Sequence, residues 1–157
     1  MGMISLSGKH TLNALLALHR MPPGTYAGAE QLAHRIHAPS NYLGKLLQKI
    51  ARAGIVEGRK GRNGGFRLSG AWQTVSLFDA LRPIEHFESF KDCFLGKPKC
   101  MRTNPCPLHE GWIRVRDQYL EFLKSTKLSD LVGEKSPKPP RTRLTGQAAV
   151  RSRTGGI

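Results

Sequence analysis

The amino-acid sequence predicts a mainly α-helical protein that contains one small β-hairpin. Three observations predict this fold class: three short apolar stripes at helical spacing before residue 55, a glycine-rich basic stretch between two short apolar segments, and a longer apolar stripe near residue 120. The chain has 157 residues, which suits one domain or one domain with an appendage. It contains no apolar run long enough to span a bilayer, so no transmembrane helix is expected.

Three helices are predicted first along the chain. Residues 9–20, 28–36 and 40–53 each carry Leu, Ile or Ala side chains at three- and four-residue steps. Ser40 is expected to be the N-cap of the third helix, and Gly54 is a suitable residue to end it. Each predicted helix therefore has one face to bury and one polar face.

A β-hairpin and a fourth helix are predicted next. The apolar segments 55–57 and 66–68 are expected to be its strands, because the stretch between them, residues 58–65, supplies four glycines for a tight connection. Residues 76–84 are then predicted to form a short helix with Ser76 as its N-cap.

The rest of the chain divides into a loop, a long helix and a tail. Residues 91–109 are rich in Cys, Pro, Gly and Lys and are predicted to be a loop, whereas residues 110–126 are predicted to be helical. Residues 133–157 have few apolar groups and are expected to be disordered. The apolar seam of the long helix fits a partner helix, and it also fits an ordinary core. It comprises Trp112, Val115, Tyr119 and Phe122 or Leu123.

The chain is strongly basic. It has 25 Lys and Arg against 11 Asp and Glu, a formal net charge of +14. Residues 134–157 contribute six cations and one acid, so the remaining residues still carry +9. Such a charge favours a polyanionic partner, and nucleic acid is the commonest one. The N-terminus shows no secretory signal, which predicts a cytoplasmic protein that does not contact a membrane.

Three short helices followed by a basic, glycine-rich hairpin predict a winged helix-turn-helix. In this fold the third helix enters the major groove of double-stranded DNA and the hairpin, or wing, contacts the backbone or the minor groove. Polar side chains on the exposed faces of both elements are the candidate contacts. They are Ser40, Asn41, Tyr42, Lys45, Gln48 and Lys49 in the helix, and Arg59, Lys60 and Arg62 in the hairpin.

Each candidate contact also has a plainer interpretation. Taken singly, Lys45 and Lys49 fit the solvated face of any helix, and Tyr42 is assigned mainly to packing, with a hydroxyl that could reach a phosphate. The prediction depends on the combination of helix, turn, helix and basic hairpin, in that order, on a positively charged body.

The three cysteines cluster in a short segment. The spacing is Cys93-x6-Cys100-x5-Cys106-x2-His109, and an odd number of cysteines in a cytosolic chain argues against a disulfide framework. Three thiolates and an imidazole can close a four-ligand site for an iron–sulfur cluster or zinc. Zinc alone is less favoured because both gaps exceed the usual C-x(2–4)-C knuckle. A redox-active trio of thiols without metal remains an alternative.

Several stretches together resemble the IscR/NsrR family of bacterial winged-helix regulators. The resemblance covers roughly residues 3–132. Its motifs are quite specific as a set, although each alone is weak. They are AEQLA (29–33), APSNYLGKLLQKI (38–50), AGIV (53–56), GRNGGFRL (61–68), VSLFDAL (75–81), CPLHEGW (106–112) and TKLSDL (126–131).

This resemblance implies a homodimer that binds a near-palindromic operator and regulates transcription, mostly as a repressor. It also implies that the long C-terminal helix is the dimerisation helix. The predicted organisation is a DNA-binding domain over 1–84, a cysteine-rich sensor loop over 85–109, a dimerisation helix over 110–132 and a basic tail over 133–157.

The resemblance further implies that the three cysteines hold a [2Fe-2S] or [4Fe-4S] cluster. In the iron–sulfur regulator of the family the fourth ligand is a His three residues after the last Cys, and His109 matches that place. The nitric oxide sensor uses an acidic residue in the first helix of the partner subunit, where this chain has Lys9 and His10, neither of them acidic. This departure favours His109 as the fourth ligand, with His10 as the weaker alternative. Two departures are that the first Cys gap is one residue longer than usual and that Gly44 stands where the iron–sulfur regulator has Glu.

Other classes of function remain as alternatives to a cluster-controlled regulator. One is a zinc-bound or metal-free thiol-sensing regulator of the same fold, and another is a general nucleic-acid-binding protein that ignores sequence. An enzyme is not expected, because Cys106 and His109 on one turn suit a ligand set better than a nucleophile and its base. No small-molecule substrate is predicted.

Overall fold

The computed structural model describes residues 3–88, 93–95 and 105–133. Cys100 lies outside the described residues. Residues 134–157, which make up nearly all of the predicted tail, also lie outside them. The predicted fold class, mainly helical with a two-stranded antiparallel hairpin, is confirmed. The elements are α1 (Leu6–His19), α2 (Ala29–Ile36), α3 (Ser40–Arg52), β1 (Val56–Arg59), β2 (Gly65–Leu68), η1 (Trp72–Thr74), α4 (Leu77–Leu81), α5 (His109–Ser125) and η3 (Leu128–Leu131).

The first three helices pack around one apolar core. The inner face of α3 is the most deeply buried, since Leu43, Leu47 and Ile50 have no exposed surface. Leu43 packs inward, whereas the adjacent Tyr42 is 40% exposed. Burial of one apolar stripe per helix explains why helical spacing in the sequence located these elements.

The ends of the first three helices lie within three residues of the sequence prediction. Helix α1 begins at Leu6 because the Ser5 hydroxyl accepts a hydrogen bond from the Gly8 amide at 3.1 Å, which makes Ser5 its N-cap. The expectation that Ser40 caps α3 is wrong: Ser40 is the first helical residue, and the N-cap is Pro39, which makes no side-chain bond. Gly54 ends α3 as predicted, with a φ of 76°.

Each strand of the hairpin is one residue longer than the predicted segments 55–57 and 66–68, and a third segment pairs with the hairpin. Strands β1 and β2 are antiparallel, with Glu57 opposite Arg67 and Arg59 opposite Gly65. Ala27, just before α2, pairs with Phe66 through two backbone hydrogen bonds of 2.8 and 2.9 Å. The wing is thereby tied to the start of the helix-turn-helix, so its orientation relative to α2 and α3 is set by backbone bonds.

Replacing Gly65 with alanine is expected to lower the free energy of unfolding by roughly 1–3 kcal/mol. Gly65 has a φ of 141°, and an added Cβ would overlap the Ala27 carbonyl oxygen. Urea denaturation measures the effect. Gly70→Ala is the matched control, because an added Cβ there meets no atom and the backbone φ is not positive. Equal stability of the two variants would contradict the prediction.

The fourth helix is shorter than the predicted 76–84. Ser76 is its N-cap, as expected, and accepts a hydrogen bond from the Asp79 amide at 3.0 Å. The helix ends at Leu81 and continues as a turn, because Pro83 cannot donate a helical hydrogen bond.

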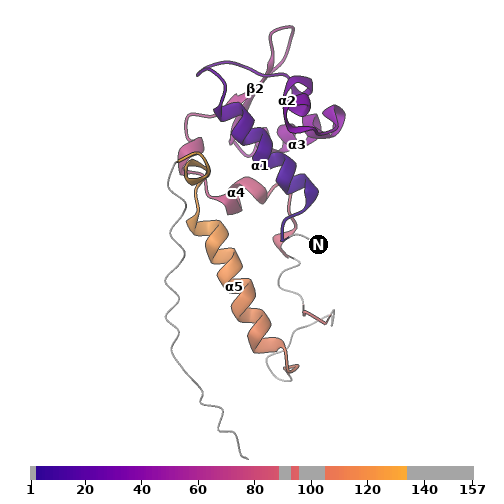
Figure 1. Cartoon of the computed structure of the whole chain (residues 1–157), viewed down its shortest axis with the longest axis vertical. Helices are drawn as coiled ribbons and strands as arrows, with labels where there is room; N and C mark the ends of the chain where they lie inside the picture. Colours follow the sequence, from indigo (N-terminus) through magenta and orange to yellow (C-terminus); the bar gives the residue numbers. More distant parts are fainter. Residues whose placement is uncertain (1–2, 89–92, 96–104, 134–157) are drawn as a thin grey trace, which may run out of the picture.

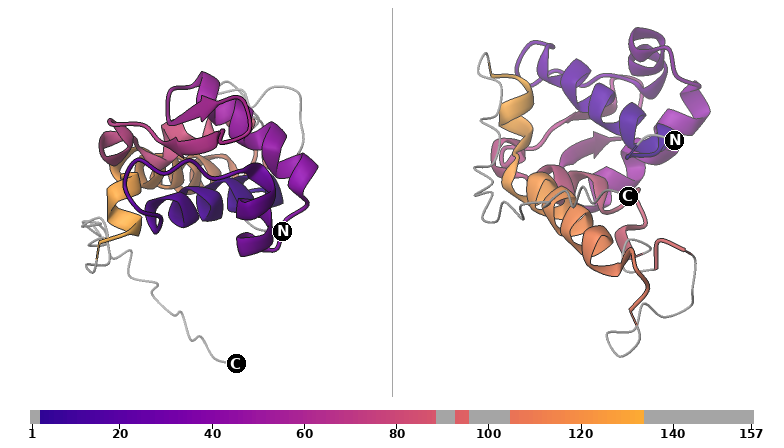
Figure 2. Two further views of the ribbon diagram at one scale, coloured as in Figure 1. Left: turned by 90° about the horizontal axis from the view of Figure 1, so that it is seen from above. Right: turned by 60° about the horizontal axis from the view of Figure 1, so that its bottom comes forward.

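The helix predicted over 110–126 is confirmed as α5, to within one residue at each end. It forms an arm that extends from the head of the molecule, which consists of α1 to α4 and the hairpin (Figures 1 and 2). Its C-terminal part packs against the head, where Tyr119 and Leu123 are buried. The Tyr119 hydroxyl donates to the Met3 carbonyl at 2.8 Å, and burial, with a smaller contribution from the Glu85 carboxylate, raises the pKa of this phenol. The hydroxyl thus keeps its proton near neutral pH.

The helical arm does not continue to residue 132. Thr126 is extended, Lys127 bridges Ser76, and a separate 3-10 turn, η3, follows. In Figure 1 the start of α5 lies at the far end of the molecule from α2 and α3. Among the described residues, no helix has the length and apolar character needed to cross a membrane.

Candidate nucleic-acid interface

The exposed face of α3 presents a straight polar stripe. Asn41, Lys45 and Gln48 are spaced by four and three residues, so they project from the same side of the helix, and all three are exposed. Lys49 is exposed beside the stripe, and Ser40 is half-buried at its start. Amide and ammonium groups on one face of a helix are suitable hydrogen-bond donors for base edges and phosphates.

Tyr42 lies apart from this stripe. Its hydroxyl is hydrogen-bonded to the Ser7 hydroxyl of α1, and its ring meets the His10 ring edge-on with a centroid distance of 6.3 Å. These contacts fit the packing role that the sequence analysis gave it, on the side of α3 that faces α1.

The wing lies beside the second half of α3. Figure 1 shows α2, α3 and the hairpin together at one end of the molecule. Arg59, Lys60 and Arg62 are all exposed. An open groove of about 470 Å³ separates the helix from the hairpin. Its lining includes Gln48 and Arg52 from α3 and Arg59 and Lys60 from the wing. The structure therefore brings predicted contacts of both elements to one hollow.

Charge on the wing is unevenly compensated. Arg67 is ion-paired with Glu57 at 2.7 Å, and the hydrogen bond that the guanidinium donates to that carboxylate is the main cause that raises the pKa of Arg67 above its ordinary value. Within the described ranges, no acidic side chain pairs with Arg59 or Arg62. Their charges remain available to a polyanion.

Two residues of this region were not among the predicted contacts. Arg52 lies eleven residues after Asn41, hence three turns along the same stripe, and the helical spacing alone could have included it. Tyr26 lines a second hollow of about 590 Å³ with Arg62. Nothing in the local sequence around Tyr26 indicates this placement, because it depends on the pairing of Ala27 with the wing.

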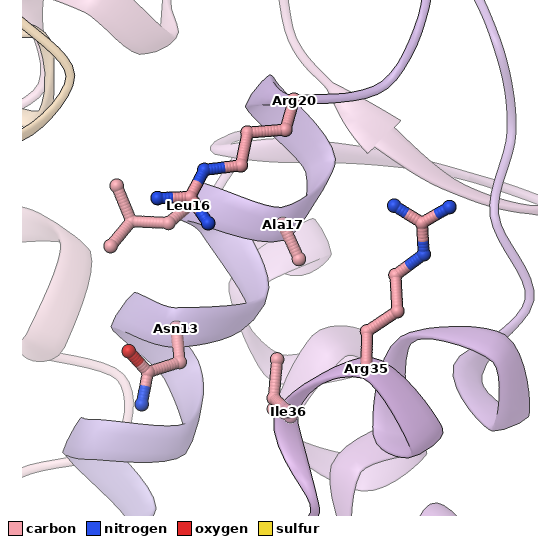
Figure 3. A pocket seen from close by; sticks show the side chains of 6 residues that line it. All are labelled: Asn13, Leu16, Ala17, Arg20, Arg35 and Ile36. Atoms are coloured by element: carbon pink, nitrogen blue, oxygen red, sulfur yellow. The ribbon is translucent and has the colours of Figure 1, made fainter.

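A further hollow lies between α1 and α2 (Figure 3). It has a volume of about 430 Å³, an apolar floor that includes Ala17, and the side chains of Arg20 and Arg35 at its rim. In this view the two guanidinium groups lie on either side of Ala17 and do not converge on one point. The hollow is consequently not assigned as an anion site.

The described part of the cysteine segment lies near the start of α5, but in the described part of the chain no three His, Cys, Asp or Glu side chains are grouped so that they could hold a metal ion. Cys93 is buried, Cys106 is half-buried, and His109 is the buried first residue of α5. The His109 amide donates to the Cys106 carbonyl at 2.9 Å, which places these two residues on one turn. The ring of Phe94, the neighbour of Cys93, packs on Trp112 with centroids 5.4 Å apart.

Helix α5 also exposes apolar side chains. Val115 is 53% exposed and Phe122 is 40% exposed, although Tyr119 and Leu123 of the same predicted seam are buried in the chain's own core. The seam thus divides into a part that packs internally and an edge that faces outward.

A helix-turn-helix followed by a basic wing defines the class of winged helix-turn-helix transcriptional regulators. The sequence profile of the Rrf2 family, described as an iron-dependent transcriptional regulator, matches residues 4–134. The chain belongs to the Rrf2 family, and the resemblance seen in the sequence is confirmed.

Relatives and solved structures agree with this family. A protein of Aquifex aeolicus (strain VF5), named as an HTH-type transcriptional regulator, is 28% identical over 121 residues, which cover 76% of this chain and 82% of that protein. Protein aau3 of Rhizobium meliloti (strain 1021) is 34% identical over 58% of this chain and 60% of its own length.

Among solved structures, CymR, the global cysteine regulator of B. subtilis, is 25% identical with a TM-score of 0.66 and covers 83% of this chain and 96% of its own. IscR of T. potens has a TM-score of 0.65 at 20% identity, covering 83% of this chain and 86% of its own, and supports the fold.

Proposed function

We propose that this chain is a cytoplasmic, sequence-specific DNA-binding regulator that acts as a homodimer on a near-palindromic operator, as a repressor. The observation that carries the proposal is the groove in which the polar stripe of α3 meets the uncompensated cations of the wing. A helix face of donors can read base edges, while the wing cations neutralise phosphates. The predicted contacts are Ser40, Asn41, Tyr42, Lys45, Gln48, Lys49, Arg59, Lys60 and Arg62, to which we add Arg52.

A dimer is supported by the outward edge of α5. Exposed apolar side chains on a long helix lose contact with water when a second copy of the helix covers them. Val115 and Phe122 are such residues. Two DNA-binding domains held at a fixed spacing would then match two half-sites of an operator.

We further propose that an iron–sulfur cluster, held by Cys93, Cys100, Cys106 and His109, controls DNA binding. The chemistry of the donors supports the proposal: Cys106 and His109 offer a sulfur atom and an imidazole at the N-terminus of α5, whose partial positive charge favours an anionic thiolate cluster. Among the described residues the side chains do not already form a group of three metal ligands, so Cys93 and Cys100 would have to complete the set. The Rrf2 description as iron-dependent also supports it. When bound, the cluster would supply a group sensitive to oxidants or nitric oxide.

The residues of the chain itself suggest how such a signal reaches DNA. Cys106 and His109 form the turn that starts α5, and Val115 lies less than two helical turns further on. A change in this turn would shift the exposed edge of α5, which is the proposed dimer contact. The spacing between the two DNA-binding domains of the dimer would then change as well.

Purification without oxygen, followed by a visible absorption spectrum and iron, sulfide and zinc assays, tests the sensor. We expect broad absorption near 400 nm or beyond, with iron and sulfide in matching amounts. The triple variant Cys93→Ala, Cys100→Ala, Cys106→Ala is expected to be colourless and to bind its operator with an affinity that no longer responds to oxidant or chelator. If the operator affinity of this variant still responded to oxidant or chelator as in the wild type, the cluster proposal would be refuted.

The same assays separate the alternatives. Zinc without iron would indicate a zinc-bound regulator of the same fold, and a metal-free protein that responds to thiol oxidation would indicate a thiol sensor. A chain that binds all DNA sequences equally, with a steep salt dependence, would be a general nucleic-acid-binding protein. Selection of a preferred sequence from a random duplex pool decides against that last alternative.

A further inference from the structure

Tyr26 lies on the face of the wing that carries its charged side chains. Because Ala27 pairs with Phe66 in antiparallel fashion, Tyr26 falls beside Arg67 of β2. Alternate residues of a strand share a face, and Glu57 stands opposite Arg67, so Glu57, Arg59 and Arg67 lie on one side of the hairpin. Tyr26 thus extends this charged face by one aromatic ring.

Two guanidinium groups stand over the ring of Tyr26. The Cζ atom of Arg67 is 4.8 Å from the ring centroid and that of Arg59 is 5.8 Å from it. Both distances lie within the range of about 6 Å in which the negative face of an aromatic ring attracts a cation.

The two arginines differ in what else they contact. Arg67 is held by Glu57 at 2.7 Å, so its charge is already compensated and its direction is fixed. Arg59 has no acidic partner among the described side chains, and it lines the groove between the wing and α3 together with Gln48 and Lys60. The ring of Tyr26 therefore orients the arginine that is available to DNA.

Orientation matters because a free arginine side chain loses many rotamers when it binds a phosphate or a base edge. A ring that already restricts these rotamers reduces the loss, which is the physical basis of pre-organisation. The contact with Tyr26 does not consume the hydrogen-bond donors of Arg59, since a ring face attracts the cation without accepting its fork of N–H groups.

We propose that Tyr26 is a positioning residue for DNA binding, which holds Arg59 of the wing in the direction from which it contacts the nucleic acid. This role rests on the proposed function of the chain as a DNA-binding regulator. It predicts that Tyr26 affects DNA affinity through Arg59 and through no other contact residue.

A double-mutant cycle tests the role on the full-length protein, with the preferred duplex obtained by selection with the wild type. Tyr26→Leu is expected to lower affinity by about two- to five-fold, the size of a partly exposed cation–π contact. Tyr26→Phe keeps the ring face and should retain most of the affinity. In an Arg59→Gln background, Tyr26→Leu should cause no further loss.

Lys49→Gln is the matched control background, because Lys49 is an exposed cation of α3 outside the contacts of Tyr26. In this Lys49→Gln background, Tyr26→Leu should lower the affinity for DNA by the same factor as in the wild type. A purely structural effect of Tyr26→Leu would appear equally in both backgrounds, and it would overturn the proposal, as would wild-type affinity of Tyr26→Leu. Thermal melting checks that the variants fold.

The outcome for the proposed function is read separately. A wild-type chain that selects no sequence refutes sequence-specific regulation, and the same cycle on a random duplex still tests Tyr26, since backbone contacts of Arg59 persist there. A wild type that selects a sequence while Tyr26 and Arg59 act independently refutes only the positioning role.

Discussion

Replacing Phe122 with glutamate is expected to convert the proposed dimer to a monomer and to lower its affinity for the full operator by roughly 10²–10⁴-fold. Phe122 is 40% exposed on the outward edge of α5, near Val115, which is 53% exposed. A carboxylate at this position would have to lose its water in the dimer interface without a partner charge. The monomer would then bind one half-site at a time and lose the gain in effective concentration.

Sedimentation equilibrium measures the oligomeric state, and titration of full and half operators measures the binding. Gln73→Glu is the matched control, because it adds the same charge at an exposed position of η1, outside α5. The control should remain dimeric. The Phe122 variant should bind the half operator as the separate heads of the wild type do, since α2 and α3 are untouched. A dimeric Phe122→Glu protein with normal operator affinity would show that another surface joins the subunits.

The helices of the head could be predicted because their apolar residues follow the helical repeat and face one core. Leu32, Leu47 and Ile50 illustrate this, since all are fully buried at spacings read from the sequence. Helix ends were less predictable. Helix α1 begins at Leu6, three residues before the predicted start, because Ser5 accepts a hydrogen bond from the Gly8 amide and also contacts Glu85, eighty positions away in sequence.

The seam of α5 shows where helical spacing stops being informative. Periodicity identifies an apolar stripe but does not say which neighbour covers it. Tyr119 and Leu123 turn out to pack on the chain's own head, whereas Val115 and Phe122 face outward. The division follows from how α5 is docked by α4 and by the segment around Met3, which are distant in sequence.

The sequence predicted most of the residues of the candidate interface, but it did not predict which of them contact one another. Glycines and cations identified the wing, and polar residues at helical spacing identified the face of α3. The compensation of Arg67 by Glu57 depends on strand register, and the position of Tyr26 depends on a bridge to Phe66. Neither could be read locally, because a shift of one residue in register would reverse the faces.

Replacing Lys45 with methionine is expected to lower operator affinity by about 1–3 kcal/mol, roughly five- to 150-fold, and to relax sequence preference at one or two base pairs. Lys45 is exposed at the middle of the α3 stripe, between Asn41 and Gln48. Methionine keeps the length of the side chain and its packing but removes the ammonium donor. Loss of a donor to a base edge would affect the matched base pair far more than other sequences.

Lys60→Met in the wing is the matched control, since it removes the same charge from an exposed position that lines the groove. It should weaken binding to all sequences alike and reduce the slope of log affinity against log salt by about one. Titration of the operator and of single-base variants at several salt concentrations distinguishes the two patterns. If Lys45→Met instead behaved like Lys60→Met, α3 would contact only the phosphate backbone at this position, and sequence would have to be read by Asn41, Gln48 or the wing.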